Sequence, residues 1–193
     1  MNRRRALMAQ SKKPSDILFE LNNRSVSTGE YVDTNVKPFL SDVDCTILLD
    51  IQINANPTSS GAVASTTQLL RVYDTSIDEL SFAIGKQSRS YSTYSKKWMS
   101  LAWSGLTNST PAVGRKRFAI THKANKVVVT IVYKMDDGSV YSWASDRNWH
   151  SIDDTLTLGG GSNIESSLPA STINLVRVYN RVLTTEEIND FFT

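Results

Sequence analysis

The sequence has one cysteine and two histidines among its 193 residues, and it has no long uninterrupted apolar run. Because Cys45 is alone, no internal disulfide can form and packing must hold the fold, as in proteins made in a reducing cytosol. No apolar stretch approaches the roughly 20 residues that a membrane-spanning helix needs. Residues 1–13 also lack the apolar segment of a secretory signal. We therefore expect a protein that neither inserts into a membrane nor leaves a cell by the secretory route.

Sequence motifs of common catalytic and metal sites are missing too. Neither His122 nor His150 belongs to a His-x-x-x-His or Cys-x-x-Cys pattern, so no zinc site is expected. There is no Gly-x-Ser-x-Gly elbow to support a Ser/His/Asp triad. The glycines at 159–161 are not followed by the Lys-Ser/Thr pair of a phosphate loop, and we interpret them as a turn. The sequence predicts no catalytic residue and no metal ligand.

Positive charge is concentrated near the N-terminus. The first thirteen residues hold no acidic residue and five basic ones, namely Arg3, Arg4, Arg5, Lys12 and Lys13. The rest of the chain has 16 basic residues against 19 acidic ones, a net charge of −3. A nucleic-acid-binding domain would have a basic face rather than a basic tip, so no nucleic-acid partner is expected. We predict a basic arm over residues 1–16 and one domain over 17–193, a length that fits a single core.

The clearest strand lies between Asp44 and Ile53. Apolar residues alternate with polar ones along it, which is the pattern of a strand with one buried face. The apolar set is Cys45, Ile47, Leu49, Ile51 and Ile53. Thr46, Asp50 and Gln52 stand on the other face, where Leu48 is the exception. Cys45 is therefore expected to face the core as a small apolar residue.

Further strand patterns follow one another between Ser/Thr/Gly/Pro segments. They cover 17–21, 29–34, 66–73, 80–85, 97–103, 116–122, 127–133, 140–143, 155–158 and 173–179. The Asp136-Asp137-Gly138 segment predicts a tight hairpin, since its glycine can adopt a positive φ. Arg115-Lys116-Arg117 is interpreted as a solvated sheet edge. Ten or eleven short strands and a single helix predict an all-β, antiparallel two-sheet sandwich.

The C-terminal residues specify that helix. The alternation from Ile173 to Tyr179 predicts a final strand, with Ile173 and Arg177 on the same face. Thr184 can cap the following helix while the Glu187 side chain reaches back to the Thr184 amide. Leu183 and Ile188 occupy the two positions of a hydrophobic staple. We expect one short C-terminal helix.

Short segments spread along the chain carry a family resemblance. They are Tyr31–Thr34, Cys45–Leu48, Arg117–Ile120, the Asp-Gly hairpin, Leu158–Gly160 and Arg177–Asn180, with Leu183, Glu187 and Ile188 after them. In this order they resemble laminin-G-like, concanavalin A-like jelly-roll domains of the lectin and glucanase kind. The resemblance implies a jelly roll over nearly the whole chain. The glucanases of this fold carry a Glu-x-Asp-x-x-Glu strand, which this sequence lacks, so the resemblance favours binding over catalysis.

The opening residues Met1–Ala9, joined to a domain with Tyr31-Val-Asp-Thr34, also resemble small proteins encoded among tail and fibre genes of bacteriophages of gut bacteria. This resemblance implies a virion component made in the cytoplasm of a bacterial host. Its partners would be a surface glycan or protein of a host cell and neighbouring virion subunits. It would work as a homo-oligomer or within a larger assembly, with the basic arm as a contact to its neighbours.

Two segments have the chemistry of a binding loop. Directly after Ser145 come a carboxylate, a guanidinium, an amide, an indole and an imidazole, carried by Asp146, Arg147, Asn148, Trp149 and His150. Planar polar groups beside an aromatic ring are suited to a sugar. The alternative is that Trp149 plugs the end of the sandwich while Asp146 pairs with Arg147 or caps a turn.

The second segment, 89–95, has the Tyr/Ser bias of adaptable recognition loops, with Tyr91 and Tyr94 as candidate contacts. A solvated loop, or one packed on a sister subunit, explains it as well. Calcium remains open, because three pairs of acidic residues could supply oxygen ligands from turns. They are Asp42 with Asp44, Asp136 with Asp137, and Asp153 with Asp154. Such acids usually cap or solvate turns, so no ligand is assigned.

The sequence thus supports three hypotheses of function. The first is a non-enzymatic, virion-associated module that binds a host-surface carbohydrate or protein. The second is a purely structural virion protein that is anchored by its basic arm. The third is a polysaccharide-cleaving enzyme whose two carboxylates come from distant strands.

Overall fold

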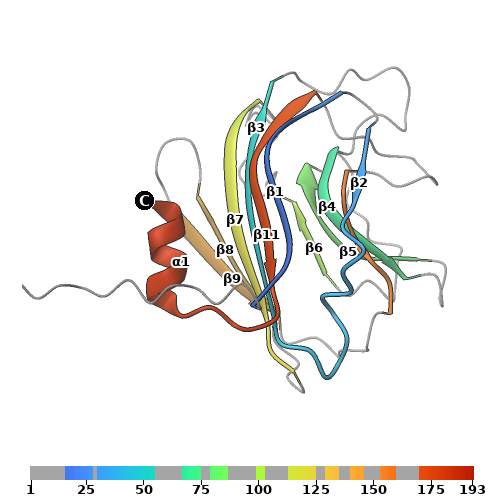
Figure 1. Cartoon of the computed structure of the whole chain (residues 1–193), viewed down its shortest axis with the longest axis vertical. Coiled ribbons are helices and arrows are strands. Elements are labelled where there is room, and N and C mark those ends of the chain that lie inside the picture. Colours follow the sequence, from blue (N-terminus) through green and yellow to red (C-terminus); the bar gives the residue numbers. More distant parts are fainter. Residues whose placement is uncertain are drawn as a thin grey trace, which may run out of the picture.

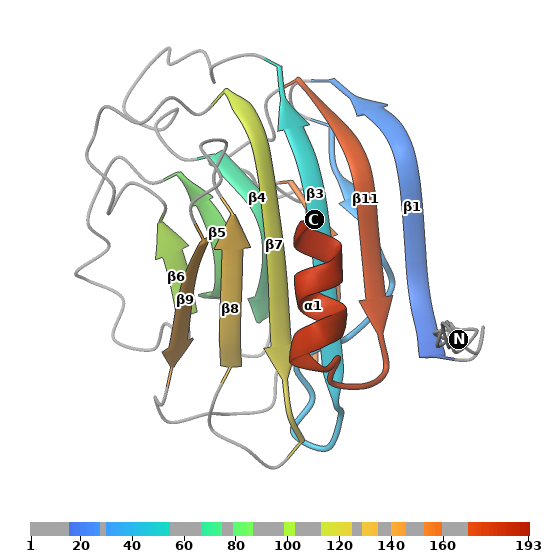
Figure 2. The ribbon, with the colours of Figure 1, turned by 90° about the vertical axis from the view of Figure 1, so that its left-hand side faces the viewer.

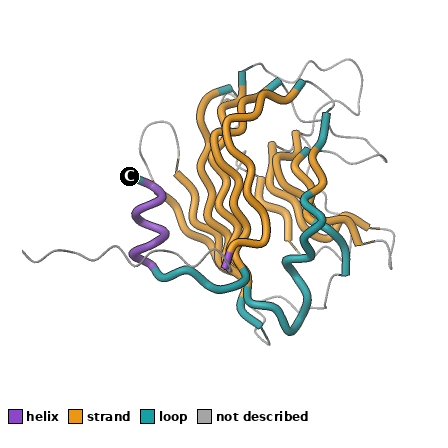
Figure 3. The backbone as a smooth tube through the Cα atoms, in the orientation of Figure 1, coloured by secondary structure: helices purple, strands orange, loops and turns teal. Residues whose placement is uncertain are grey.

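The computed structural model describes residues 16–27, 30–54, 67–74, 79–86, 99–102, 113–124, 129–134, 140–145, 153–159 and 170–193. They form two β-sheets stacked face to face, with one helix on the outside of the larger sheet (Figures 1 and 3). The predicted two-sheet sandwich with one C-terminal helix is therefore confirmed.

The larger sheet has six strands in the order β1-β11-β3-β7-β8-β9, and every neighbouring pair is antiparallel. Its strands are β1 (Ile17–Val26), β3 (Cys45–Ile53), β7 (Gly114–His122), β8 (Val129–Lys134), β9 (Val140–Ser145) and β11 (Ser171–Tyr179). The final strand β11 lies between the first strand and β3. The two ends of the sequence therefore meet within one sheet (Figure 2).

The smaller sheet has five strands in the order β2-β10-β4-β5-β6. They are β2 (Val32–Asp33), β4 (Thr67–Asp74), β5 (Glu79–Lys86), β6 (Met99–Ala102) and β10 (Leu156–Leu158). One pair departs from the predicted antiparallel pattern, because β6 pairs with β5 in parallel. A parallel neighbour needs a crossover connection rather than a tight turn. Residues 87–98, which separate the two strands in the sequence, lie outside the described residues.

Two strand boundaries differ from the prediction near the N-terminus. The polar residues after Leu21 do not form a turn, since β1 continues to Val26 in register with β11. The strand expected over 29–34 contains only Val32 and Asp33. It stops there because Asn35 has a φ of 56° and donates its amide to the Asp33 carboxylate at 2.8 Å.

The core lies between the sheets and uses the predicted alternation of β3. The five alternating apolar residues of that strand, from Cys45 to Ile53, face inward and are fully buried. Phe118 and Ile120 of β7 and Val176 and Val178 of β11 meet them from the neighbouring strands. Burial raises the pKa of the Cys45 thiol, so this cysteine is a neutral packing group as predicted.

The basic segment at the start of β7 is not a solvated sheet edge, so that interpretation is wrong. β7 runs between β3 and β8, in the interior of the larger sheet. Lys116 lies opposite Ile51 and is only 2% exposed, whereas Arg115 and Arg117 point to the outer face. Strand alternation therefore separates the three basic residues onto two faces.

The face alternation predicted for the last strand is also interrupted. Between Ile173 and Leu175 the pairing of β11 with β3 shifts by one residue, which leaves Asn174 as a bulge. Ile173 faces the core, and beyond the bulge Val176 and Val178 face it in turn. Arg177 consequently lies on the opposite face from Ile173, not on the same face.

The helix α1 (Thr185–Phe192) begins as predicted. Thr184 accepts the Glu187 amide at 3.3 Å, and the Glu187 carboxylate accepts the Thr184 amide at 2.9 Å. Leu183 and Ile188 are both buried in the cluster beneath the helix. The helix lies across the outer face of the larger sheet, over β3 and β7 (Figure 2).

The packing of this helix on the sheet explains why Leu48 is apolar on the outer side of β3. Leu48 joins Ala119 and Tyr179 in a second cluster, which we call the helix seat and which is covered by Leu183, Ile188 and Phe192. Leu48 is thus buried on the outer face of the sheet by the helix rather than by the core.

Candidate functional site

The residues predicted to bind a ligand lie outside the described residues. Tyr91 and Tyr94 belong to the segment between β5 and β6, and Asp146, Arg147, Asn148, Trp149 and His150 follow the last residue of β9. In Figure 2 the arrow of β5 points toward the upper end of the sandwich, and that of β9 points toward the lower end. The two segments therefore begin at opposite ends of the molecule.

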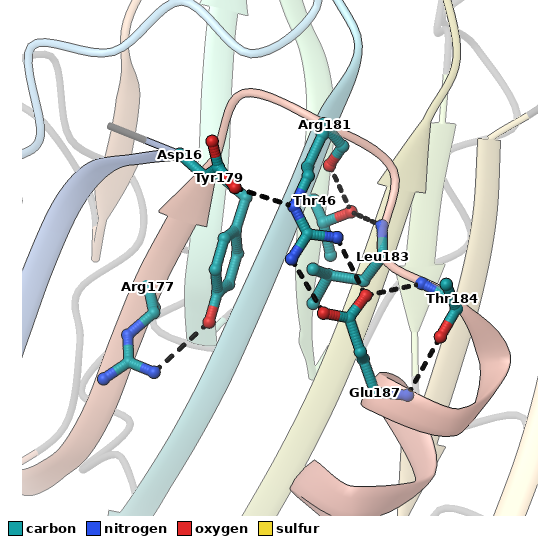
Figure 4. A network of polar contacts seen from close by, with 8 residues as sticks. All are labelled: Asp16, Thr46, Arg177, Tyr179, Arg181, Leu183, Thr184 and Glu187. Atoms are coloured by element: carbon teal, nitrogen blue, oxygen red, sulfur yellow. Dashed lines mark hydrogen bonds and ion pairs between the residues drawn. The ribbon is translucent and has the colours of Figure 1, made fainter. Parts of the chain in front are cut away.

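The basic residues of the predicted arm, Arg3, Arg4, Arg5, Lys12 and Lys13, also lie outside the described residues. The point where the described chain begins is well defined. Asp16 accepts the Asn180 amide through its backbone carbonyl at 2.9 Å, and its carboxylate pairs with Arg181 at 3.3 Å. The domain start is thereby held to the turn before α1 (Figure 4).

Arg181 lies at the centre of the contacts between the domain start and α1, which we call the junction. Its guanidinium donates two hydrogen bonds to the Glu187 carboxylate at 2.7 and 2.8 Å and lies over the Tyr179 ring. These contacts with Glu187, together with Asp16, raise its pKa. Its backbone carbonyl accepts the Thr46 hydroxyl at 2.8 Å (Figure 4). The junction is a structural tie, because Arg181 joins Asp16, Tyr179 and Glu187 from three parts of the chain.

A second polar group of residues lies on the same outer face, in the part of the larger sheet beyond the helix seat. We call it the outer polar patch. It consists of Glu20 and Asn22 from β1, Asp50 from β3, Arg115 from β7, and Asn174 and Arg177 from β11. The patch crosses four adjacent strands and is formed by carboxylates, amides and guanidinium groups.

Asp50 is the most buried member of the patch. Its side chain is only 8% exposed, while that of Arg115 above it is 53% exposed. Arg115 Nε donates to Asp50 Oδ1 at 2.9 Å, its Nη2 donates to Oδ2, and Asn174 Nδ2 donates to Oδ1 at 3.0 Å. Burial alone would raise the pKa of Asp50, but these hydrogen bonds outweigh it and lower the pKa. The carboxylate is therefore held ionised.

A second set of contacts extends the patch toward β1. Arg177 Nε donates to the Glu20 carboxylate at 2.7 Å, and Asn22 donates to the same carboxylate at 2.7 Å. These two hydrogen bonds lower the pKa of Glu20. Arg177 also donates to the Tyr179 hydroxyl at 3.2 Å. This second set of contacts thus reaches the helix seat through Tyr179.

The end of α1 borders the patch. Arg117 donates to the Phe191 carbonyl at 3.3 Å and lies over the Phe192 ring at 5.9 Å. The two phenylalanine rings pack edge to face at 5.2 Å, and Phe191 is only half-buried. An aromatic edge and a row of ordered polar groups therefore lie side by side on one sheet face.

In each of the two acidic pairs that the structure describes, one member considered for calcium is engaged in another contact. Asp44 accepts the Ala124 amide at 2.8 Å, and Asp153 pairs with Lys37 at 2.6 Å. Across the described ranges, no group of three or more His, Cys, Asp or Glu side chains is placed to hold a metal ion. Asp136 and Asp137 lie outside those ranges.

The outer polar patch is not predicted by the sequence patterns. They place Asp50 on a polar strand face and Arg115 at a solvated sheet edge, give Glu20 and Asn22 no role, and place Arg177 on the same face as Ile173. The missing signal was the register of β11, because the bulge at Asn174 decides which of its residues reach β3. A bulge leaves only a weak mark in a sequence.

The comparisons with known proteins support the fold. No family model matches the sequence, and no curated protein matches it. Among solved structures, the CBM40 module of the Ruminococcus gnavus IT-sialidase is similar to 92% of this chain. The match covers 100% of that module, with a TM-score of 0.55 and 12% sequence identity.

The same sandwich occurs within larger proteins. A leech intramolecular trans-sialidase matches 93% of this chain with a TM-score of 0.53 and 15% identity. NanB matches 90% of it with a TM-score of 0.52 and 11% identity. This chain spans only 28% of the length of each of these two proteins. At such identities the likeness shows the fold alone, and it confirms the predicted jelly-roll sandwich.

The one helix of the described residues is far too short to cross a membrane. It serves instead to cover part of a sheet.

Proposed function

We propose that this chain is a non-enzymatic carbohydrate-binding module. The observation that carries this proposal is that its sandwich matches the whole CBM40 module of the Ruminococcus gnavus sialidase, and that module has been solved with alpha2,6 sialyllactose bound. The likeness supports a glycan as the ligand, and it leaves the choice of sugar to this chain's own side chains.

The binding residues belong to the segments after β5 and β9. Trp149 supplies an aromatic face for the C–H side of a sugar ring, and Asp146, Arg147, Asn148 and His150 supply hydrogen bonds to its hydroxyls. Tyr91 and Tyr94 add aromatic area at a low cost in side-chain entropy.

The absence of catalysis is part of this proposal. A glycosidase needs one carboxylic acid whose pKa is raised, so that it can protonate the leaving group. The described carboxylates with shifted pKa values move in the other direction. The Ser27 amide and Arg24 lower the pKa of Glu30, Arg177 lowers that of Glu20, and the hydrogen bonds to Asp50 outweigh the effect of its burial. These groups are suited to structure and recognition.

The setting of the module is a bacteriophage virion, assembled in the cytoplasm of a bacterial host. There the module recognises a carbohydrate or protein on the host surface, and the basic arm contacts neighbouring subunits in a homo-oligomer or larger assembly. The resemblance of residues 1–9 and 31–34 to small phage tail and fibre proteins supports this setting.

A glycan array probed with the full chain tests the function. We expect binding to a limited set of oligosaccharides, lost in Trp149→Ala and weakened in Tyr94→Ala. Trp98→Ala is the matched control, since Trp98 belongs to neither predicted contact set. A blank array for the wild-type chain, or binding unaffected by both substitutions, would contradict the proposal.

A purely structural virion protein is the second candidate. It is favoured by the junction in which Arg181 ties Asp16 to α1, because this fixes the point where the arm leaves the domain. If this candidate is right, phage that encode a chain without residues 1–15 will not incorporate it, although the domain remains folded. Normal incorporation of the shortened chain would reject it.

A further inference from the structure

We propose that the outer polar patch is itself a saccharide-binding surface, which takes the hydroxyl groups of an uncharged pyranose against the larger sheet, beside the end of α1. This inference rests on the proposed carbohydrate-binding function. It adds a second surface to the predicted loop contacts.

The first observation is the buried carboxylate of Asp50. It lies outside the core, on a sheet face, yet its side chain is only 8% exposed. An apolar residue there would avoid the desolvation penalty, and a buried ion pair is often no more stabilising than apolar packing. What Asp50 does provide is orientation. It accepts three hydrogen bonds from Arg115, two of them from Nε, and one from Asn174, which fixes both partners in place at the surface.

The second observation is the bulge that brings Asn174 to Asp50. A regular β11 would not shift its pairing with β3 at this point, and bulges recur where a strand must redirect a side chain. The neighbouring strand bends at the same level, because Asn23 of β1 has a φ of 50°. For a residue other than glycine this conformation is uncommon. Two strands therefore depart from regular geometry to form one row of polar groups.

The ligand class follows from the chemistry of the patch. Sugar hydroxyls both donate and accept hydrogen bonds, and the patch offers carboxylate acceptors next to guanidinium and amide donors. Asp50 is paired with Arg115, and Glu20 is paired with Arg177. Arg117, which lies opposite Asp50, is engaged by the Phe191 carbonyl and the Phe192 ring. These paired charges favour the hydroxyl groups of an uncharged ring over an acidic sugar. The half-buried Phe191 offers an apolar edge for the C–H face of the ring.

Two variants test this surface without leaving a buried charge unpaired. In the first, Asp50→Asn is combined with Arg115→Gln, so both charges are removed together. In the second, Asn174→Ala removes the amide. The matched control is Arg24→Ala, because Arg24 forms a similar half-exposed ion pair with Glu30, and neither residue belongs to the patch. The probe is the array oligosaccharide that binds the full wild-type chain most strongly.

We expect each patch variant to bind this oligosaccharide at least about tenfold more weakly in calorimetry, a loss of about 1.4 kcal/mol, and the control to bind as the wild type does. In amide NMR spectra of the wild-type chain, the oligosaccharide should shift the signals of Asp50, Arg115 and Asn174. The NMR measurement needs no variant, so it decides the matter even if a variant fails to fold.

Unchanged affinity in both patch variants, with no shifts at these three amides, would overturn the inference. If Trp149→Ala still abolished binding in that case, the carbohydrate-binding function would stand and the loops alone would carry it. A wild-type chain that binds no oligosaccharide would remove both proposals.

Discussion

Arg181 joins parts of the fold that are distant in the sequence. It links Asp16 at the start of β1 to Glu187 in the first turn of α1, and its carbonyl is bound by Thr46 of β3. Thr46 in turn accepts the Leu183 amide at 3.0 Å. A single side chain and its backbone thus hold the first strand and the helix to the same point.

Replacing Arg181 with alanine should therefore destabilise the domain by about 1–2 kcal/mol, since several hydrogen bonds between charged groups are lost. Urea unfolding followed by tryptophan fluorescence measures this. Arg24→Ala is the control, because its pair with Glu30 is more exposed, and exposed pairs contribute little to stability. Equal effects of the two substitutions would show that the junction has no special role.

His122 should make stability depend on pH. It lies opposite Cys45, with its ring edge-on to Phe39 at 5.9 Å. Burial lowers its pKa, although Asp44 and backbone groups of Pro38 and Val43 act in the opposite direction. Because the unfolded chain binds the proton more readily than the folded one, acid favours unfolding.

The free energy of unfolding should consequently be constant near neutral pH and should fall below about pH 6.5, by up to about 1.4 kcal/mol per pH unit. Urea titrations at a series of pH values measure the slope. His122→Leu should flatten the profile between about pH 6.5 and 5, whereas His150→Gln should not. A wild-type profile without slope in that window would refute the role of His122. The lowered pKa values of Glu20 and Asp50 should add a further loss of stability only at lower pH.

At the scale of elements, α1 is fixed to the sheet by packing as well as by its cap. Ile188 and Phe192 are buried against Leu48, Ala119 and Tyr179. Ile188→Ala should therefore cost about 2–3 kcal/mol, in the range for large-to-small substitutions at buried sites. Asp190→Ala on the exposed side should change stability by less than about 0.5 kcal/mol. Thermal unfolding of both variants compares them directly, and a similar midpoint for the two would mean that the helix seat contributes little.

The elements also show what the sequence can and cannot predict. The alternation of β3 and the capping box at Thr184 are local patterns, and both are confirmed in detail. The bulge at Asn174 and the parallel pairing of β6 depend on contacts between distant segments. No local pattern of residues marks them. The candidate patch was missed for this reason, since it is built by the register of four strands rather than by one motif.

Two residues that depart from the predicted strand patterns are explained by the fold. Leu48 is an apolar residue on the polar face of its strand because a helix covers it. Lys116 contradicts the solvated-edge interpretation because its strand lies inside the sheet. The residues predicted to bind a ligand in the loops, Tyr91, Tyr94 and Asp146 to His150, stay predictions.

At the scale of the whole molecule, the described domain begins at Asp16, and its first contacts are with Asn180 and Arg181. Removing residues 1–15 should therefore leave the thermal midpoint and the far-ultraviolet circular dichroism of the domain nearly unchanged, because Asp16 is kept. Asp16→Ala in the full-length chain should lower the midpoint more than the deletion does. A deletion that unfolds the domain would show that the arm is part of the core.

The irregular geometry of β1 affects whether copies of the protein associate when they are held close together. β1 is the outermost strand of its sheet, and an exposed, regular outermost strand invites the backbone of another molecule to add to it. Two features interrupt the regular row of backbone donors and acceptors along β1. They are the register shift between Ile17 and Phe19 and the left-handed backbone conformation at Asn23. Copies held close together can therefore remain separate sandwiches instead of fusing into one continuous ribbon.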